Sequence, residues 1–433
     1  MVAILTAVGN RWDSSVATLL GSSGQVRIAR RCADLADLLA TASSGVGAVA
    51  VVGEDLRGLS LTVVSRLRAS GLEVVGLVDP DDEGSERRLR QMGVLLVLPA
   101  DATLAAAEST LLTAVEGGGV DPWPAWPQLD DEGLVTGPGS PSPAPAAGQR
   151  GRIVAVWGPA GAPGRTTVAV HLAAELAGMG VSTLLVDADT YGGSVAQTLA
   201  VLDEAPGLVG AARAADQGTL DLPALARLAP QVGRGMRVLT GIPRAQRWPE
   251  VRAAALERVL DLARTLAQVV VVDCGFCLES DEELSYDTEA PRRNQATLTT
   301  LQVADELLAV SGADPVSLQR LVRGLQDLAS VRSPQPRVVV NRLRPGAVGV
   351  RPDLRVREAL ARFAGIDQVW FVPDDPAAVD AALLAGRTLA ECAPSAPSRA
   401  ALRALAAQVA GVRATESARG SVARAEGRGR RRR

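Results

Sequence analysis

The stretch that decides the fold is "RIVAVWGPAGAPGRTTVAVHLAAELAGMG", residues 152–180. An apolar run passes into a loop rich in glycine and proline, and an amphipathic segment follows at once. This is the strand–loop–helix context of a phosphate-binding loop, in which backbone N–H groups and the positive end of the helix hold phosphate oxygens. Such a loop ordinarily carries a lysine, and Arg165 stands in its place. The sequence therefore predicts a nucleotide site whose charged side chain is an arginine.

The composition is that of a globular chain without lysine. Hydrophobic residues make up 47% of the 433 residues, and all 45 basic side chains are arginines. The net charge of −3 neither favours nor excludes a nucleic-acid partner. No run of about 18 apolar residues occurs, and no basic segment precedes the first apolar run, so neither a membrane span nor a signal peptide is predicted. We expect a cytoplasmic protein, with peripheral contact at the inner face of the plasma membrane left open.

The cysteines and the single histidine do not form a recognisable site. Four cysteines, Cys32, Cys274, Cys277 and Cys392, are too few for a disulfide framework in a chain of this length. Cys274 and Cys277 form one C-x-x-C pair, which cannot complete a four-ligand zinc site, and His171 is far away in the sequence. We interpret the cysteines as small packed side chains and His171 as a packed or capping residue.

Composition divides the chain into four segments. The first, 1–116, alternates five short apolar runs with amphipathic stretches, which predicts a parallel α/β sandwich. A linker rich in proline, glycine and serine covers 117–150. A second α/β unit with seven apolar runs covers 151–414, where near-continuous valine and leucine runs predict strands buried on both faces. An arginine-rich tail that we expect not to fold covers 415–433.

The first segment resembles the receiver domains of two-component regulators. A working receiver has an acidic pair after its first strand, an acceptor aspartate after its third strand and a lysine after its fifth. Here no carboxylate follows the first strand, Glu54 and Asp55 lie a little beyond the acceptor position, and no lysine is present. Without acids to hold Mg²⁺, little drives phosphoryl transfer to Asp55. We therefore predict a pseudo-receiver that serves as an interaction domain.

Three aspartates follow apolar runs of the second unit. Asp187 and Asp189 end the run "LLVDAD", and Asp273 follows "QVVVV". The carboxyl ends of parallel strands converge on the crevice where α/β folds bind ligands. One carboxylate there can hold Mg²⁺ through water while another orients the attacking water. Thr166 offers the hydroxyl for Mg²⁺, and Asn341 in "VVVNRL" is placed to contact a base edge.

This ordered series resembles the MinD/ParA family of deviant Walker ATPases, and the resemblance covers 151 to about 412. Its parts are the loop, D-x-D, a strand ending in aspartate, "NR" and "PDDPAAVDAALLAG". With a receiver-like segment in front, the chain looks most like the CpaE branch of pilus-assembly and cell-pole localisation ATPases; septum-site regulators of actinobacterial type have the same build. The resemblance implies a P-loop NTPase domain with a mainly parallel sheet between helices. It also implies ATP or ADP and Mg²⁺ as ligands, and a nucleotide-dependent homodimer.

The resemblance assigns a role to each motif residue. The nucleotide-binding residues of the loop are Gly161, Ala162, Gly164, Arg165, Thr166 and Thr167. Asp189 falls on the water-orienting acid and, with Arg165, forms the catalytic pair. Thr166 and, through water, Asp273 form the Mg²⁺ site. Asn341 falls on the adenine contact.

The loop departs from the family pattern K-G-G-x-G-K-T-T. Ala160 replaces the lysine that reaches the partner's phosphates in family dimers, and Ala162 replaces a glycine. Pro163 removes one backbone donor. Arg165 keeps the charge of the second lysine, but its planar fork is not interchangeable with an ammonium group. We therefore expect nucleotide binding to survive better than hydrolysis, which depends on charge at the transferred phosphoryl group.

Two arginines beyond the motif are candidates for the missing charge. Arg244 and Arg247 lie in "LTGIPRAQRWPEVR", and either could replace the lysine from a partner subunit. Ordinary solvated surface arginines are the alternative interpretation.

Three functions fit these residues. The first is a slowly hydrolysing positioning ATPase whose dimer recruits a protein partner at the cell pole, the septum or a membrane-associated assembly. The second is a nucleotide-binding scaffold that regulates division or secretion without turnover. The third is a DNA-partitioning ATPase, supported only by the tail "GRGRRRR", which predicts weak contact with an anionic membrane or with DNA.

Overall fold

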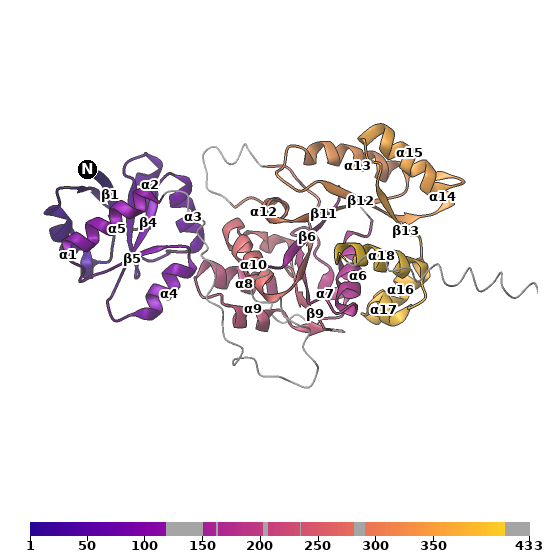
Figure 1. Cartoon of the computed structure of the whole chain (residues 1–433), viewed down its shortest axis with the longest axis horizontal. Coiled ribbons are helices and arrows are strands. Elements are labelled where there is room, and N and C mark those ends of the chain that lie inside the picture. Colours follow the sequence, from indigo (N-terminus) through magenta and orange to yellow (C-terminus); the bar gives the residue numbers. More distant parts are fainter. Residues whose placement is uncertain (118–149, 162, 202–206, 234, 281–290, 412–433) are drawn as a thin grey trace, which may run out of the picture. The chain divides into compact units, whose positions relative to one another are not determined.

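The computed structural model describes residues 1–117, 150–161, 163–201, 207–233, 235–280 and 291–411. The predicted tail, Ala162 and nearly all of the predicted linker lie outside these residues. The chain divides into two compact units, of which the first contains a five-stranded sheet and the second an eight-stranded sheet (Figure 1). Within the described residues, no helix combines the length and the hydropathy needed to cross a membrane.

The five-stranded sheet is parallel throughout, in the order β2-β1-β3-β4-β5. Its strands are β1 (Val2–Ala7), β2 (Val26–Arg31), β3 (Val49–Gly53), β4 (Glu73–Val78) and β5 (Leu96–Pro99). This is one of the two common orders of doubly wound α/β sheets. Each strand coincides with one of the five predicted apolar runs, so the prediction of a parallel α/β sandwich is confirmed.

Helices cover both faces of this sheet. They are α1 (Asn10–Gly21), α2 (Leu35–Ser43), α3 (Leu61–Ala69), α4 (Glu83–Gln91) and α5 (Leu104–Glu116). Successive strand residues point to opposite faces. Ile4 therefore packs with α1 and α5, whereas its neighbour Leu5 packs with α2, α3 and α4. Two separate apolar layers hold the unit together.

The eight-stranded sheet has the order β13-β12-β11-β6-β10-β7-β9-β8. Its strands are β6 (Arg152–Trp157), β7 (Thr183–Ala188), β8 (Gln231–Val232), β9 (Met236–Leu239), β10 (Val269–Cys274), β11 (Glu306–Gly312), β12 (Pro336–Leu343) and β13 (Val369–Pro373). Every pairing is parallel except that of β8 with β9. The predicted fold class, a mainly parallel sheet between helices, is confirmed. The two-residue edge strand β8 was not predicted.

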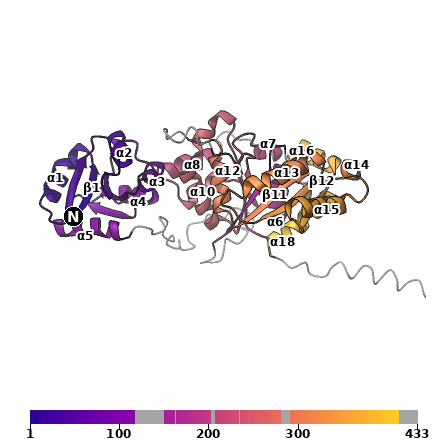
Figure 2. The same ribbon diagram turned by 90° about the horizontal axis from the view of Figure 1, so that it is seen from above.

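Helices connect these strands in chain order. They are α6 (Arg165–Gly178), α7 (Val195–Thr198), α8 (Gly207–Asp216), α9 (Leu222–Leu228), α10 (Ala253–Leu266), α12 (Gln295–Val303), α13 (Pro315–Leu328), α14 (Pro345–Val348), α15 (Pro352–Ala364), α16 (Pro376–Ala385), α17 (Leu389–Cys392) and α18 (Pro397–Val409), with a 3₁₀ helix η2 (Ala245–Glu250) before α10. By their contacts, the segments Val209–Leu228 and Pro249–Leu262 group with the first unit. Figure 2 shows α13 beside β11, with α15 next to it.

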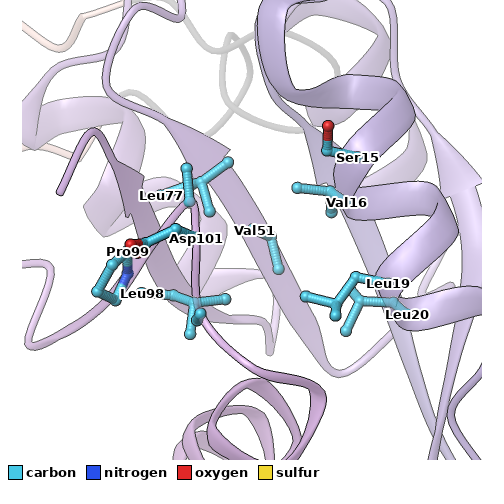
Figure 3. A pocket seen from close by; sticks show the side chains of 11 residues that line it. Ser15, Val16, Leu19, Leu20, Val51, Leu77, Leu98, Pro99 and Asp101 are labelled. Carbon is cyan, nitrogen blue, oxygen red and sulfur yellow. The ribbon is translucent and has the colours of Figure 1, made fainter.

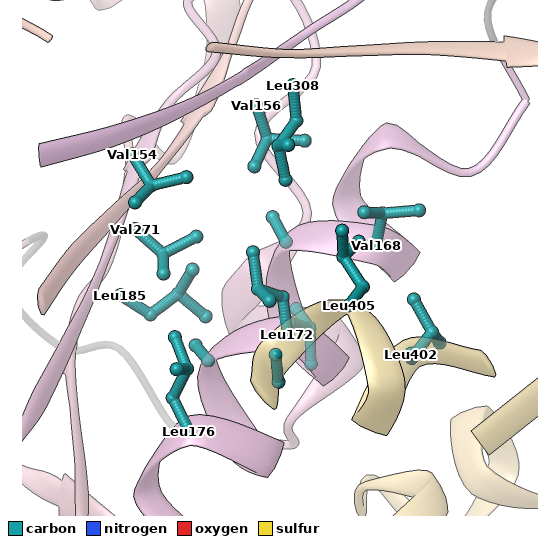
Figure 4. Close-up of a cluster of buried hydrophobic side chains, with 14 of the residues drawn as sticks. Val154, Val156, Val168, Leu172, Leu176, Leu185, Val271, Leu308, Leu402 and Leu405 are labelled. Atoms are coloured by element: carbon teal, nitrogen blue, oxygen red, sulfur yellow. The ribbon is translucent and has the colours of Figure 1, made fainter. Parts of the chain in front are cut away.

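The core of the second unit fixes the helix that follows the glycine-rich loop. Leu172 and Leu176 of α6 pack with Leu405 of α18 against Val154 and Val271 of the sheet (Figure 4). Fully burying a leucine or valine side chain contributes about 1.5–3 kcal/mol each. Because α6 is held along its whole length, its first turn and the loop before it have a fixed position at the carboxyl end of β6.

Candidate functional site

The loop between β6 and α6 turns on two glycines. Gly161 has φ +74° and Gly164 has φ +90°, backbone conformations that side chains other than glycine rarely adopt. Gly164 is also the N-cap of α6, and no side chain caps this helix end. The first backbone N–H groups of α6 therefore remain available to an anion, which is the arrangement expected of a phosphate site. Thr167 lies in this first turn, and its predicted contact with nucleotide stays a prediction.

Thr166 and Asp273 meet at the carboxyl ends of adjacent strands. The Thr166 hydroxyl donates a hydrogen bond to Asp273 Oδ2 over 2.6 Å. The other carboxylate oxygen, Oδ1, is buried and has no hydrogen-bond partner in the described part of the chain. An unpaired buried carboxylate oxygen costs free energy unless a ligand satisfies it. Mg²⁺ is held by oxygen atoms, usually by one or two side chains with retained waters, so this pair fits the predicted Mg²⁺ site.

Burial perturbs the acids at this edge. Desolvation, with a smaller contribution from the nearby charge of Asp187, raises the pKa of Asp273 to about 8. Desolvation also raises the pKa of Asp187 to about 7, against hydrogen bonds from the backbone N–H groups of Val195 and Asp189. A cation bound beside Asp273 would favour its ionised form, because an opposite charge stabilises a carboxylate. Three buried carboxyl groups, Asp187, Asp189 and Asp273, thus lie at this edge, and Arg165 forms an ion pair with only one of them, Asp189.

The two aspartates of the D-x-D motif have different partners. Asp187 accepts hydrogen bonds from the backbone N–H groups of Asp189 at 3.2 Å and Val195 at 3.1 Å, so it shapes the turn after β7. Asp189 Oδ1 accepts from the backbone N–H groups of Tyr191 at 2.8 Å and Gly192 at 3.2 Å. Its Oδ2 faces the phosphate loop instead. Asp189 is thus the member of the pair that can act on a ligand there.

Arg165 turns inward from the start of α6. Its Nη2 donates to Asp189 Oδ2 at 3.2 Å, and its Nη1 donates to the Gly158 carbonyl oxygen at 3.3 Å. The side chain of Arg165 is 16% exposed and that of Asp189 is 7% exposed, so the ion pair is largely desolvated. The structure therefore brings the two predicted catalytic residues together, but as an ion pair in which Arg165 and Asp189 bind each other.

Asn341 lies against the loop. Its side-chain amide nitrogen donates to the Pro163 carbonyl oxygen at 3.1 Å, and a Cβ atom on Gly164 would lie 2.1 Å from that nitrogen. Asn341 therefore supports the turn that precedes α6. Its predicted contact with adenine stays a prediction, and so does the role of Ala162, which lies outside the described residues.

A cluster behind Asp189 was missed by sequence reasoning. The Tyr191 ring lies 4.7 Å from the Phe276 ring, and the Arg293 guanidinium lies over the Tyr191 ring at 4.0 Å. The Tyr191 hydroxyl donates to Asn294 Oδ1 at 2.7 Å. These contacts tie the turn after β7 to the segment after β10 and to the start of α12. A tyrosine two residues after D-x-D was the only signal, and it carries no spacing rule.

Arg320 on α13 was also missed. Its Nη1 donates to the Ala160 carbonyl oxygen at 3.4 Å. Helix α13 follows β11, which pairs with β6, so its first turns lie at the same sheet edge as the phosphate loop. The convergence of carboxyl strand ends that identified Asp273 applies equally to this segment, and it could have directed attention to Arg320.

His171 is packed within α6, whereas Cys274 lies near the charges of Asp273, Arg165 and Asp189. His171 is buried on α6, and its Nδ1 accepts from the Leu389 backbone N–H at 3.3 Å at the start of α17. Burial lowers the pKa of His171 to about 4. The interpretation of His171 as a packed, capping residue is confirmed. Cys274 is buried at the end of β10, where burial raises the pKa of its thiol, and Cys277 is half-buried.

The two candidate arginines lie at η2. Arg244 is exposed immediately before it, and Arg247 is half-buried within it. A contact of either side chain with a partner subunit stays a prediction.

Of the acidic residues at the strand ends of the first unit, Glu54 and Asp79 have polar partners, and Asp55 is exposed. A Cβ atom on Gly9 would lie 1.9 Å from Asp55 Oδ2, so this carboxylate rests on the glycine that follows β1. Glu54 Oε2 accepts from the Asp79 backbone N–H at 3.3 Å, and Asp79 forms an ion pair with Arg11 at 2.8 Å.

The first unit also contains a cavity of about 180 Å³, between α1 and the ends of β3, β4 and β5 (Figure 3). Mainly apolar side chains line it, with Ser15 and Asp101 as polar members. Glu54 and Asp55 are not among the lining residues, so the cavity is separate from these two carboxylates.

Comparison with known proteins supports the fold of the second unit. No protein-family model matches the sequence, and no curated protein matches it. The structure is similar to a ParA family ATPase from Chlorobium tepidum, with a TM-score of 0.50 and 16% identity over 59% of this chain and 98% of that chain.

Two further solved structures are similar at a lower score. The septum site-determining protein MinD from Pyrococcus horikoshii, complexed with Mg-ADP, has a TM-score of 0.48 and 18% identity over 60% of this chain and 95% of that chain. A Cyanothece McdA variant in complex with ATP has a TM-score of 0.48 and 17% identity over 62% of this chain and 99% of that chain. The parallel order of the sheet and the Chlorobium structure agree: the eight-stranded unit has a P-loop NTPase fold like that of the ParA family ATPase.

Proposed function

We propose that the protein binds Mg-ATP at the loop of residues 158–167 and hydrolyses it slowly. The observation that carries this proposal is the pair of Thr166 and Asp273, whose hydroxyl and unpaired buried carboxylate oxygen lie beside an uncapped helix start. A P-loop fold shared with a ParA family ATPase supports the same assignment.

Each residue of the site has a role that follows from its position. The N–H groups of the first turn of α6 bind phosphate oxygens, and the helix dipole favours their negative charge. Thr166 and Asp273 would hold Mg²⁺, which neutralises phosphate charge when bound. Asp189 Oδ2 accepts a hydrogen bond from a water molecule and orients that water toward the terminal phosphate. Arg165 donates to phosphate oxygens, for which its planar guanidinium is well suited.

The ion pair between Arg165 and Asp189 accounts for slow turnover. Both groups are required at the terminal phosphate, yet in the free protein each satisfies the other at 3.2 Å. Phosphate must displace Asp189 from Arg165, which costs part of a desolvated, charge-assisted contact. After displacement, Asp189 Oδ2 is free to accept from water. Nucleotide binding must therefore come first, because Arg165 and Asp189 can take their hydrolytic positions only after their ion pair has separated.

Steady-state phosphate release by the purified protein tests turnover. We expect Mg²⁺-dependent release that Asp189→Ala abolishes while nucleotide binding is retained. Tyr191→Phe is a matched control in the same turn, since it changes one hydroxyl and leaves both catalytic carboxylate oxygens in place. Release that persists in Asp189→Ala at the parent's rate would contradict the role given to Asp189.

A non-hydrolysing regulatory scaffold is the second candidate function. The closed pair of Arg165 and Asp189 favours it, because a site whose acid stays paired binds nucleotide without turning it over. Tight binding of ATP with no phosphate release above the Asp189→Ala background would select this alternative.

The wider role follows from the resemblance to MinD/ParA ATPases of the CpaE type. Nucleotide would stabilise a homodimer, and the dimer would recruit a protein partner in a septum, pilus or secretion assembly, with the first unit acting as a pseudo-receiver. Light scattering of the full chain with ATP, and without it, tests the dimer. Salt-dependent binding to duplex DNA tests the partitioning alternative, for which the supporting tail lies outside the described residues.

A further inference from the structure

Helix α13 fits closely against the phosphate loop. A Cβ atom on Gly324 would lie 3.1 Å from Pro159 Cβ and 3.1 Å from Trp157 Cη2. At the preceding strand end, a Cβ atom on Gly312 would lie 2.8 Å from Pro163 Cγ. Both glycines remove the bulk that would separate the loop from the segment β11–α13. The segment is therefore part of the surroundings of the site.

Arg320 lies one turn before Gly324, on the same side of α13. Its Nη1 donates to the Ala160 carbonyl oxygen at 3.4 Å. A Cβ atom on Gly161 would lie 2.3 Å from Nη1, closer than any real contact allows. The guanidinium therefore rests directly on the loop, in space that exists because residue 161 is glycine.

In the part of the chain that the structure describes, Arg320 has no carboxylate partner. Within the described residues, its one polar contact is the neutral Ala160 carbonyl group, and its side chain is exposed. Arg165, by contrast, is paired with Asp189. Of these two arginines beside the loop, only Arg320 has a charge without a carboxylate partner.

We propose that Arg320 binds the phosphate groups of the nucleotide held by its own chain, as a second cation beside Arg165. This inference rests on the proposed nucleotide binding. The loop itself is short of donors, since Pro163 has no N–H and Ala160 has no charge. A triphosphate carries several negative charges, and arginine recognises phosphate oxygens through two parallel hydrogen bonds. A cation delivered from α13 supplies what positions 160 and 163 lack.

Arg320→Gln tests the charge with little change in size, and Arg320→Lys keeps the charge. Arg323→Gln is a matched control, because Arg323 is also an exposed arginine of α13 and lies three residues further along the helix. The dissociation constant for Mg-ATP is measured by calorimetric titration of the full chain at low and at moderate salt. Thermal unfolding of each variant confirms that the fold is intact.

We expect Arg320→Gln to weaken Mg-ATP binding about tenfold or more, the effect of losing a charge-assisted hydrogen bond. Arg320→Lys should lose much less, Arg323→Gln should bind as the parent does, and the affinity of Arg320→Gln should depend less on salt.

Two results overturn the inference, and they can be told apart. If the parent binds and Arg320→Gln binds equally tightly, or no more weakly than Arg323→Gln, then Arg320 does not contact phosphate and the proposed function stands. If the parent itself binds no nucleotide, the proposed function fails and the inference fails with it.

Discussion

Both units place acidic side chains at the carboxyl ends of parallel strands, but the two edges differ in what those acids contact. In the first unit, Asp55 rests on Gly9 and Asp79 pairs with the exposed Arg11 at 2.8 Å. In the second unit, Asp273 keeps one buried oxygen without a partner beside the Thr166 hydroxyl. Asp55 at the first edge is thus exposed to solvent, whereas Asp273 at the second edge is buried with one oxygen that no described residue satisfies.

The difference teaches that a strand-end aspartate is a weak indicator of a site by itself. The second edge adds a helix start without a capping side chain and two glycines in the left-handed region, and these supply the donors that an anion needs. The first edge has Asp55 beside a glycine, yet the side chain fills that space instead of leaving it for a ligand. The second edge differs from the first in two features: a buried carboxylate oxygen that no described residue satisfies and backbone N–H groups available at the start of α6.

Replacing Asp273 should have the largest effect. We expect Asp273→Asn to lower the Mg²⁺-dependent affinity for ATP about 10–100-fold, the usual cost of removing a group that holds a metal through water. The same variant should leave the ligand-free protein as stable or more stable, because a buried carboxylate with a raised pKa is replaced by a neutral amide. Magnesium titrations monitored by calorimetry, together with thermal unfolding, check both parts. Unchanged Mg²⁺ dependence would show that Asp273 is only a structural acid like Asp55.

Arg165 comes next in magnitude. Arg165→Ala should weaken Mg-ATP binding by about tenfold or more, since a charge-assisted hydrogen bond contributes ~1.5–3 kcal/mol. Arg165→Lys should retain binding, and combined with Ala160→Lys it should raise hydrolysis by restoring charge at the transferred phosphoryl group. Titration calorimetry and phosphate release decide. If Arg165→Ala bound Mg-ATP as tightly as the parent, Arg165 would not contact phosphate at the second edge.

The single histidine of the chain should give the second unit a pH-dependent stability, because His171 is buried there. The folded pKa of His171 is about 4, below its ordinary value of 6.5, so the unfolded chain binds the proton first as the pH falls. The contribution of neutral His171 to stability should fall from pH 6.5 toward 4, by at most about 1.4 kcal/mol per pH unit, while the raised pKa values of Asp187 and Asp273 act in the opposite direction in both the parent and the variant. Denaturant unfolding of the parent and of His171→Gln checks this, and the slopes should differ. Equal slopes would contradict a buried neutral histidine.

The smallest expected effect is at Asp55, where we predict no reaction. Its carboxylate rests on Gly9, and no lysine exists in the chain to stabilise a phosphorylated form. Incubation with a small phosphodonor followed by intact-mass measurement should show the unmodified mass. A mass increase that Asp55→Asn removes would mean that the first edge is a working receiver site.

The sequence predicts the sheets better than the neighbours of the site. The valine- and leucine-rich runs of both units predicted buried strands, and they form strands in the structure. The convergence of the carboxyl ends of parallel strands predicted that Thr166 and Asp273 lie close together, and the two side chains share a hydrogen bond. The two-residue strand β8 is too short to show any periodicity.

Arg320 was not found because its position depends on sheet order, a non-local property. An arginine on an amphipathic helix resembles any surface arginine, and only the pairing of β11 with β6 places α13 beside the loop. The partners of Arg165 were missed for a similar reason. The motif names Arg165 and Asp189 separately, and their contact depends on the turn after β7, which Asp187 shapes.

Calorimetric titration of the full chain with ATP, with Mg²⁺ and then without it, tests the central claim most directly. The account predicts binding of one nucleotide per chain, made at least tenfold tighter by Mg²⁺, since Asp273 and Thr166 offer the oxygen ligands beside the phosphate loop. Absence of binding under both conditions, or binding that Mg²⁺ leaves unchanged, would contradict a magnesium–nucleotide site at residues 158–167.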